Sequence, residues 1–170
     1  MQLTDSALPT GAFSHSLGFE TYMHAEQLED RESFSAWLEM FVDQQLTHTD
    51  ALAVRLVYAA EDFERVEDLD DLVTVQALPR QIREGGMTMG GRLLSIGARS
   101  YPGEWVQRYE QGVVEERLHG HQATVWGVLA RELGVPEDTA VASHVYATVI
   151  SLTQNAVRGI PCLLYTSDAA

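Results

Sequence analysis

The side chains in this sequence that are best suited to bind a metal or to catalyse a reaction are its six histidines, two of which lie close together. His119 and His121 are separated by one residue. On a helix, side chains two residues apart point in different directions, so they chelate a metal poorly compared with a pair four residues apart. The sequence contains neither an HExxH motif nor a repeated Glu-x-x-His pair. We therefore interpret these histidines as surface or supporting residues, and we predict neither a metal site nor a cofactor.

A second arrangement that could support catalysis is Ser14-His15-Ser16, which places a base between two hydroxyl groups and suggests a hydrolase. Many hydrolases carry the nucleophile in a G-x-S-x-G turn after a strand, and this sequence shows neither feature. A triad assembled from distant residues remains open. The glycine pairs at 85–86 and 90–91 lack the spacing of a phosphate-binding loop, and no lysine is present to complete one. The residues alone do not indicate a convincing active site.

The composition of the chain argues against several classes of function. The chain has 170 residues, of which 45% are hydrophobic, which predicts a single folded domain. Its net charge of −14 argues against non-specific nucleic-acid binding, because neutralising phosphates needs a basic face. All basic residues are arginine, and the single cysteine, Cys162, excludes an internal disulfide. No apolar run approaches the length of a membrane span, so we expect a soluble, cytoplasmic protein.

The elements that must position these side chains are predicted to be helical from the start of the chain. Pro9 and Gly11 predict a turn that directs the first helix. We expect Ser14 or Ser16 to cap that helix and its core face to contain Leu17, Tyr22, Ala25 and Leu28. Asp30 is expected to cap a second helix, and Thr47 to Asp50 to interrupt it. The core face of the second helix is predicted to comprise Phe34, Trp37, Leu38, Phe41, Val42 and Leu46.

The middle of the chain predicts further helices and one acidic corner. Residues 51–60 are apolar on most sides, as in a helix central to a bundle. Residues 61–71 contain seven acids and are interpreted as a solvated helix end and corner, followed by a short helix over 72–78 that stops at Pro79. A helix from Arg83 contains the glycine pairs. Glycine costs a helix about 1 kcal/mol relative to alanine, so these pairs indicate close backbone contact or conditional helicity.

The last third of the chain predicts three more helices. Residues 104–118 are weakly amphipathic. A helix over 120–132 should end at Gly134 and turn four side chains inward: Val125, Val128, Leu129 and Leu133. The last helix should run from Glu137 to about Arg158. Every element is helical, which predicts an all-α, single-domain helical bundle. Its core is expected to include Trp37, Phe41, Leu52, Leu129 and Val145.

Five stretches, in order along the chain, resemble the UreF family of urease accessory proteins. The first and most specific is D-S-A-L-P-T-G-A-F-S-H-S-L-G-F-E, from Asp5 to Glu20. The others are T-D-A-L-A-V-R-L from Thr49, L-P-R-Q-I-R-E-G-G-M-T-M-G-G-R-L-L from Leu78, H-G-H-Q-A-T-V-W-G-V-L from His119, and N-A-V-R-G-I-P from Asn155. Together the stretches extend the resemblance from about Met1 to Pro161.

The resemblance implies a non-enzymatic chaperone for nickel insertion. UreF-like proteins are all-α, dimerise, and join UreD (also called UreH) to the GTPase UreG so that nickel is delivered to apo-urease. The resemblance implies a partner-binding role for Ser14, His15, Ser16, Glu20 and Arg92, with Glu20 as the strongest candidate for control of the GTPase. The motif positions with an expected structural role are Pro9, Gly11, Gly90, Arg158 and Pro161.

The two ends of the chain depart from the family pattern. We expect residues 1–161 to form the UreF-like domain, with a clipped N-terminus and a missing C-terminal part, and residues 162–170 to be a foreign tail. In the family the C-terminal part contributes to docking on UreD, so we expect this form to bind UreD poorly. The alternative from another class is an all-α metal-dependent hydrolase or oxygenase, which stoichiometric bound metal would favour.

Overall fold

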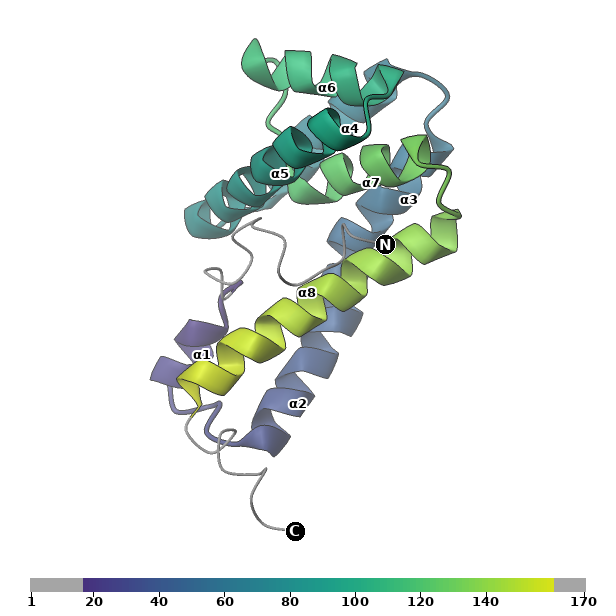
Figure 1. The fold of residues 1–170 in the computed structure, drawn as a ribbon. Helices are drawn as coiled ribbons and strands as arrows, with labels where there is room; N and C mark the ends of the chain where they lie inside the picture. The colour runs from purple at the N-terminus through teal and green to yellow at the C-terminus, as the bar shows by residue number, and fades with distance from the viewer. Residues whose placement is uncertain (1–16, 161–170) are drawn as a thin grey trace.

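A computed structural model describes residues 17–160 of the chain, and all regular structure within that range is helical (Figure 1). This confirms the predicted all-α, single-domain bundle. No helix in this range is long and apolar enough to cross a membrane. The elements are α1 (Phe19–His24), α2 (Arg31–Phe41), the π-helix η3 (Val42–Ala51), α3 (Leu52–Ala59), α4 (Phe63–Gln76), α5 (Arg80–Ser100), α6 (Glu104–Val114), α7 (Gln122–Glu132) and α8 (Glu137–Gly159).

Helices α2, η3 and α3 follow one another without an interruption. Asp30 caps α2 as predicted, because its Oδ1 accepts from the Ser33 amide at 2.8 Å and the Ser33 hydroxyl accepts from the Asp30 amide at 3.2 Å. The predicted break at Thr47 to Asp50 is wrong. The backbone there winds more widely, as a π-helix, and the Thr47 hydroxyl donates to the Val42 carbonyl at 2.8 Å. The polar run is therefore part of a continuous helical rod, in which Thr47 and His48 are exposed and Asp50 points inward.

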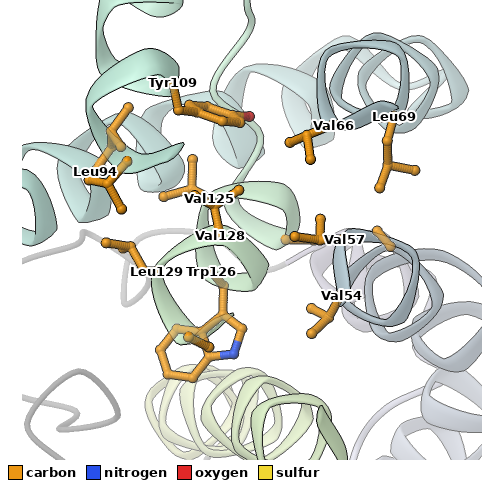
Figure 2. Packing of buried hydrophobic residues seen from close by; sticks show 14 of the residues in the cluster. Val54, Val57, Val66, Leu69, Leu94, Tyr109, Val125, Trp126, Val128 and Leu129 are labelled. Carbon is orange, nitrogen blue, oxygen red and sulfur yellow. The ribbon is translucent and has the colours of Figure 1, made fainter. Parts of the chain in front are cut away.

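The buried apolar side chains form two cores. The first core lies among α3 to α7 and the start of α8, and α7 runs through its middle (Figure 2). Its fully buried members include Val54, Val57, Val66, Tyr109, Val125, Val128 and Leu129. The second core joins α1, α2 and η3 to the end of α8, around Phe19, Trp37, Phe41, Leu46 and Leu152. Helix α8 contributes to both cores, and in Figure 1 it runs along the molecule from near α7 to near α1.

Three of the five predicted core residues are buried: Trp37, Phe41 and Leu129. Val145 is partly buried beside the second core. Leu52 is 45% exposed, so its prediction is wrong. An α-helix buries only the face that meets its neighbours, and α3 uses Ala53, Val54 and Val57 for that purpose, which leaves the side of Leu52 outward.

Most of the acidic stretch folds as part of a helix, and only its start forms a corner. Asp62 caps α4 by accepting from the Arg65 amide at 3.0 Å, and α4 then continues to Gln76. The predicted corner is confirmed only at residues 60–62, where the chain turns from α3 into α4, and the separate short helix over 72–78 is wrong. Val66, Leu69 and Val73 recur at helical spacing and bury one face of α4, so the acids of this helix other than the buried Asp70 can occupy the remaining faces.

The region around α7 agrees more closely with the sequence. Val125, Val128 and Leu129 are buried as predicted, whereas Leu133 at the end of the helix is 36% exposed. Gly134 follows with a φ of +67°, a left-handed conformation that glycine adopts without strain at a helix end. Pro136 is the N-cap of α8, one position before its first helical residue.

Candidate functional site

Helix α1 is shorter than predicted and begins differently. Leu17 and Gly18 both have positive φ, 48° and 97°, so the helix starts only at Phe19. Gly18 is its N-cap and has no side chain with which to cap the helix, whereas Ser14 and Ser16, the predicted caps, lie outside the described residues. The predicted core face is also partly wrong: Leu28 is buried, whereas Tyr22 is 39% exposed, Ala25 is exposed and Leu17 is only partly buried.

Phe19 holds the start of α1 in place. Its side chain is 2% exposed, and its ring lies 5.9 Å from the Trp37 ring and 6.2 Å from the Phe34 ring, both edge to face. Because neighbouring helical residues point in different directions, anchoring Phe19 turns Glu20 outward, where it is exposed. Glu20 is thus an exposed carboxylate on a backbone that aromatic packing fixes.

Glu20 lines a groove between α1 and the first half of α5. The groove has a volume of about 590 Å³. One wall contains Leu17, Gly18, Glu20 and Thr21, and the other contains Pro79, Gln81, Ile82, Glu84, Gly85 and Thr88. Both carboxylates, Glu20 and Glu84, are exposed, so the groove has an acidic character. Such a groove suits a basic side chain of a partner protein.

Arg92 lies on the same side of α5 as one wall of this groove. Glu84, Thr88 and Arg92 are spaced four residues apart and therefore follow one another along one face of the helix. Arg92 is exposed, but it is not among the residues that line the groove. The structure thus brings Glu20 next to α5 and places Arg92 one turn beyond the groove.

The remaining predicted residues lie elsewhere. Gly90 is buried in α5, and Arg158 lies in the last turn of α8, where its guanidinium donates to the Asn155 side-chain oxygen. The structure describes none of Pro9, Gly11, Ser14, His15, Ser16 and Pro161, so these predictions fall outside the described residues.

Helix α5 lines the groove with one face, and its adjacent face packs tightly against the start of α7. A Cβ atom at Gly90 would lie 2.0 Å from the Gly120 carbonyl oxygen and 2.7 Å from the Gln122 amide nitrogen. At Gly86 it would lie 2.8 Å from Nε2 of His121. Gly90 therefore lets two backbone segments meet, and Gly86 makes room for the His121 ring. Close backbone contact, one of the two interpretations of the glycine pairs, is confirmed for Gly90, whereas Gly91 has open space beside it.

Sequence reasoning missed the residue that organises the segment facing these glycines, Asp70 of α4. Its carboxylate accepts from the backbone amides of residues 119, 120 and 121 at 2.6, 3.2 and 2.9 Å. It also accepts from the Tyr109 hydroxyl at 2.5 Å and from the Thr124 hydroxyl at 2.8 Å. Asp70 is fully buried, so one carboxylate satisfies polar groups from three segments in the core.

The surroundings of Asp70 affect Tyr109 as well. Burial raises the pKa of the Tyr109 hydroxyl well above its ordinary value, and the charge and hydrogen bond of Asp70 raise it further. The hydroxyl therefore stays protonated and donates. A sequence signal existed, because Asp70 falls on the apolar stripe of α4 one residue after Leu69, but the six neighbouring acids obscured it.

The two histidines of the close pair have different environments. His119 is exposed, and its ring lies 3.0 Å from the Asp71 carboxylate. His121 is 5% exposed, so the prediction of a surface position is wrong for it, although a supporting role fits. Its Nδ1 accepts from the Ala123 amide at 3.3 Å, which caps α7. Burial lowers the pKa of His121 below its usual range, against the opposing charges of Asp50 and Asp70.

A second buried polar pair lies near His121. Nε2 of His144 is 3.3 Å from Oδ2 of Asp50, and the Gln122 side-chain amide donates to the same oxygen at 3.3 Å. Burial opposes ionisation of Asp50, but the hydrogen bond and charge of His144, the charge of His121 and the hydrogen bond of Gln122 together lower the pKa of that carboxyl. Within residues 17–160, no three His, Cys, Asp or Glu side chains are arranged to hold a metal ion.

Comparison with known proteins identifies relatives over almost the whole chain. A sequence model of the UreF family matches residues 28–163. A urease accessory protein UreF from Kocuria rhizophila is 92% identical over 169 residues, which cover 99% of this chain and 72% of that protein. Proteins of the same name from Corynebacterium efficiens and Paenarthrobacter aurescens are 53% and 49% identical, over 95% and 94% of this chain and 70% of each relative.

Proposed function

Since this chain belongs to the UreF family of urease accessory proteins, we propose that it acts in urease maturation as a non-enzymatic nickel-insertion chaperone. In this proposal it joins UreD (UreH) to the GTPase UreG and regulates GTP-dependent nickel delivery to apo-urease. It works in the cytoplasm, as the resemblance implies.

The observation that carries this proposal is the position of Glu20 in the α1–α5 groove. Phe19 anchors the backbone of Glu20, and the contact of α5 with α7 through Gly86 and Gly90 fixes the opposite wall. Two exposed carboxylates, Glu20 and Glu84, therefore stand on rigid elements. Carboxylates held on ordered backbone in this way can bind a lysine or arginine of the GTPase at little entropic cost, although Glu84 must exchange its 3.6 Å ion pair with Arg80.

A structural role for Glu20 is the competing explanation. A carboxylate in the first turn of a helix gains some tenths of a kcal/mol from the helix dipole. Helix α1 has only six residues, and Glu20 is exposed, so this gain is small. We therefore assign Glu20 to partner binding.

We also propose that the chain forms a homodimer, as the family resemblance implies, through a surface on α8 that is separate from the groove of Glu20. Tyr146 on α8 is 62% exposed, and it lies beside Ala142 and Ser143 in a shallow hollow of the same helix. An exposed tyrosine on a surface of small side chains is a common anchor in protein interfaces. Tyr146→Asp should therefore shift the purified chain towards monomer in sedimentation velocity, whereas an unchanged distribution would exclude this face.

The experiment that tests the function measures activation of apo-urease by UreD, UreG, nickel and GTP together with this chain. Glu20→Ala should change GTPase binding or urease activation while leaving the melting temperature nearly unchanged. Glu39→Ala is the matched control, because Glu39 is also an exposed helical glutamate but lies on α2 outside the groove. If Glu20→Ala melts well below the parent yet activates urease normally per folded molecule, the glutamate is structural and the assignment is wrong.

The same preparation separates the accessory protein from the alternative enzyme class. The accessory role predicts that the chain alone does not hydrolyse GTP and does not retain metal after purification. Stoichiometric bound metal, or a hydrolytic turnover that a point change in this chain abolishes, would favour the metal-dependent enzyme.

A further inference from the structure

A second groove lies between α3 and α4, and none of its lining residues lines the groove of Glu20. It has a volume of about 450 Å³ and an apolar floor to which Leu56, Leu69 and Leu72 contribute. Leu56 is 44% exposed and Leu72 is 49% exposed, although both are large apolar side chains. Neither the first core nor the second core includes them.

The apolar surface continues beyond this groove. Leu52 precedes Leu56 by one turn of α3 and is 45% exposed, and Val75 follows Leu72 by one turn of α4 and is 53% exposed. Four large apolar side chains therefore form a stripe on two helices that pack against each other. Contiguous exposed apolar surface of this kind marks an interaction site more often than scattered single residues do.

The rim of the groove is acidic. Glu61, Asp62 and Asp68 line it together with one arginine, Arg65, whose Nη1 lies 3.8 Å from Oδ2 of Asp68. The other acids of α4 are used elsewhere, because Glu64, Glu67 and Asp71 pair with Arg108, Arg117 and His119. The groove thus carries a net negative charge around an apolar floor.

The combination of an apolar floor and an acidic rim limits which molecules can bind in the α3–α4 groove. A second copy of the chain, paired symmetrically on this face, would bring carboxylates against carboxylates. An anionic lipid surface would meet the same repulsion. A helix that presents apolar side chains between lysines or arginines complements both the floor and the rim.

We propose that the α3–α4 groove docks an amphipathic helix of a partner protein, whose apolar stripe is flanked by lysine or arginine. This surface is distinct from the α1–α5 groove and does not depend on the role of Glu20. The partner's apolar side chains cover Leu56 and Leu72, and its basic side chains pair with Glu61 and Asp68.

The test uses a fluorescein-labelled synthetic helix of about 18 residues, with leucines on one stripe and lysines on the other faces, long enough to be helical alone. Fluorescence anisotropy measures its affinity for the purified chain. Leu56→Ser/Leu72→Ser should weaken binding by about tenfold or more, as expected when central apolar anchors are lost. Met40→Ser/Val114→Ser is the control, because these exposed apolar residues, 42% and 77% exposed, lie on α2 and α6 outside the groove, and it should bind like the parent.

A second pair of variants tests the rim. Glu61→Arg/Asp68→Arg should weaken binding and reduce its dependence on salt, whereas Glu29→Arg/Glu39→Arg, away from the groove, should do neither. Circular dichroism melts establish that each variant is folded. The proposal is overturned if the serine variant binds the peptide like the parent, or if a peptide with glutamate in place of lysine binds equally well. It is also overturned if the serine variant alters only the oligomeric state, because the occupant is then a second copy.

Discussion

Gly90 of α5 lies so close to Gly120 that a Cβ atom at Gly90 would be 2.0 Å from the Gly120 carbonyl oxygen. This contact seats α5 on the segment leading into α7, and α5 in turn forms one wall of the groove that contains Glu20. The geometry of the candidate site therefore depends on a backbone contact on a neighbouring face of the same helix.

Gly90→Ala should destabilise the protein by about 3 kcal/mol, because the methyl group forces two backbone segments apart. Gly91→Ala is a close control, since no atom lies within 4 Å of its added Cβ. At that position alanine should stabilise the helix by up to about 1 kcal/mol. Urea unfolding measures both changes, and similar unfolding free energies for the two variants would contradict the packing described here.

Asp70→Asn should lower the free energy of unfolding by about 3 kcal/mol, because asparagine keeps only one acceptor oxygen and its NH2 group faces hydrogen-bond donors at the position of the other. The neighbouring Asp71→Asn removes only an exposed contact with His119 and should cost less than about 0.5 kcal/mol. Chemical unfolding at pH 7 compares the two variants. A small effect for Asp70→Asn would show that water or backbone movement can replace its hydrogen bonds.

The buried His121 predicts a loss of stability in mild acid. Its folded-state pKa is lowered, chiefly by burial, so below about pH 6.5 the unfolded chain takes up a proton that the folded chain resists. The stabilising contribution is complete above that pH and is lost as the pH falls. Urea unfolding between about pH 7.5 and 5.5 should show this decline.

His121→Asn provides the matching variant, because asparagine can still cap α7 but does not titrate. The decline in stability towards acid pH should be shallower in this variant than in the parent. His24→Asn, at an exposed position in α1, should leave the pH dependence unchanged. Identical slopes for the parent and His121→Asn would mean that other groups cause the decline.

Glu84→Ala should alter urease activation in the same direction as Glu20→Ala if both carboxylates bind one partner. Glu84 is exposed, and its side chain forms a 3.6 Å ion pair with the exposed Arg80, so the stability should change by less than about 0.5 kcal/mol. Activation assays with single and double variants measure the coupling. Strictly independent effects on activation would indicate that the two residues contact different partners.

The sequence by itself determined the helical class, the cap at Asp30, the end of α7 at Gly134 and the family, because these depend on local spacing and on the order of motifs. Helical periodicity also identified the buried face of α2, where Phe34, Trp37 and Phe41 recur at intervals of three and four residues.

Only the tertiary structure decided which side of an apolar helix is buried and which acid is internal. Leu52 and Val54 are both apolar, but α7 packs on the side of Val54, and a helix that is apolar all round carries no local signal for that choice. Asp70 resembles its acidic neighbours in sequence, yet backbone amides 49 to 51 residues away make it a core residue. Likewise, two positive φ angles at Leu17 and Gly18 shorten α1, and the packing of Phe19 turns Glu20 towards α5. Such contacts join residues distant in the chain, so local propensity does not encode them.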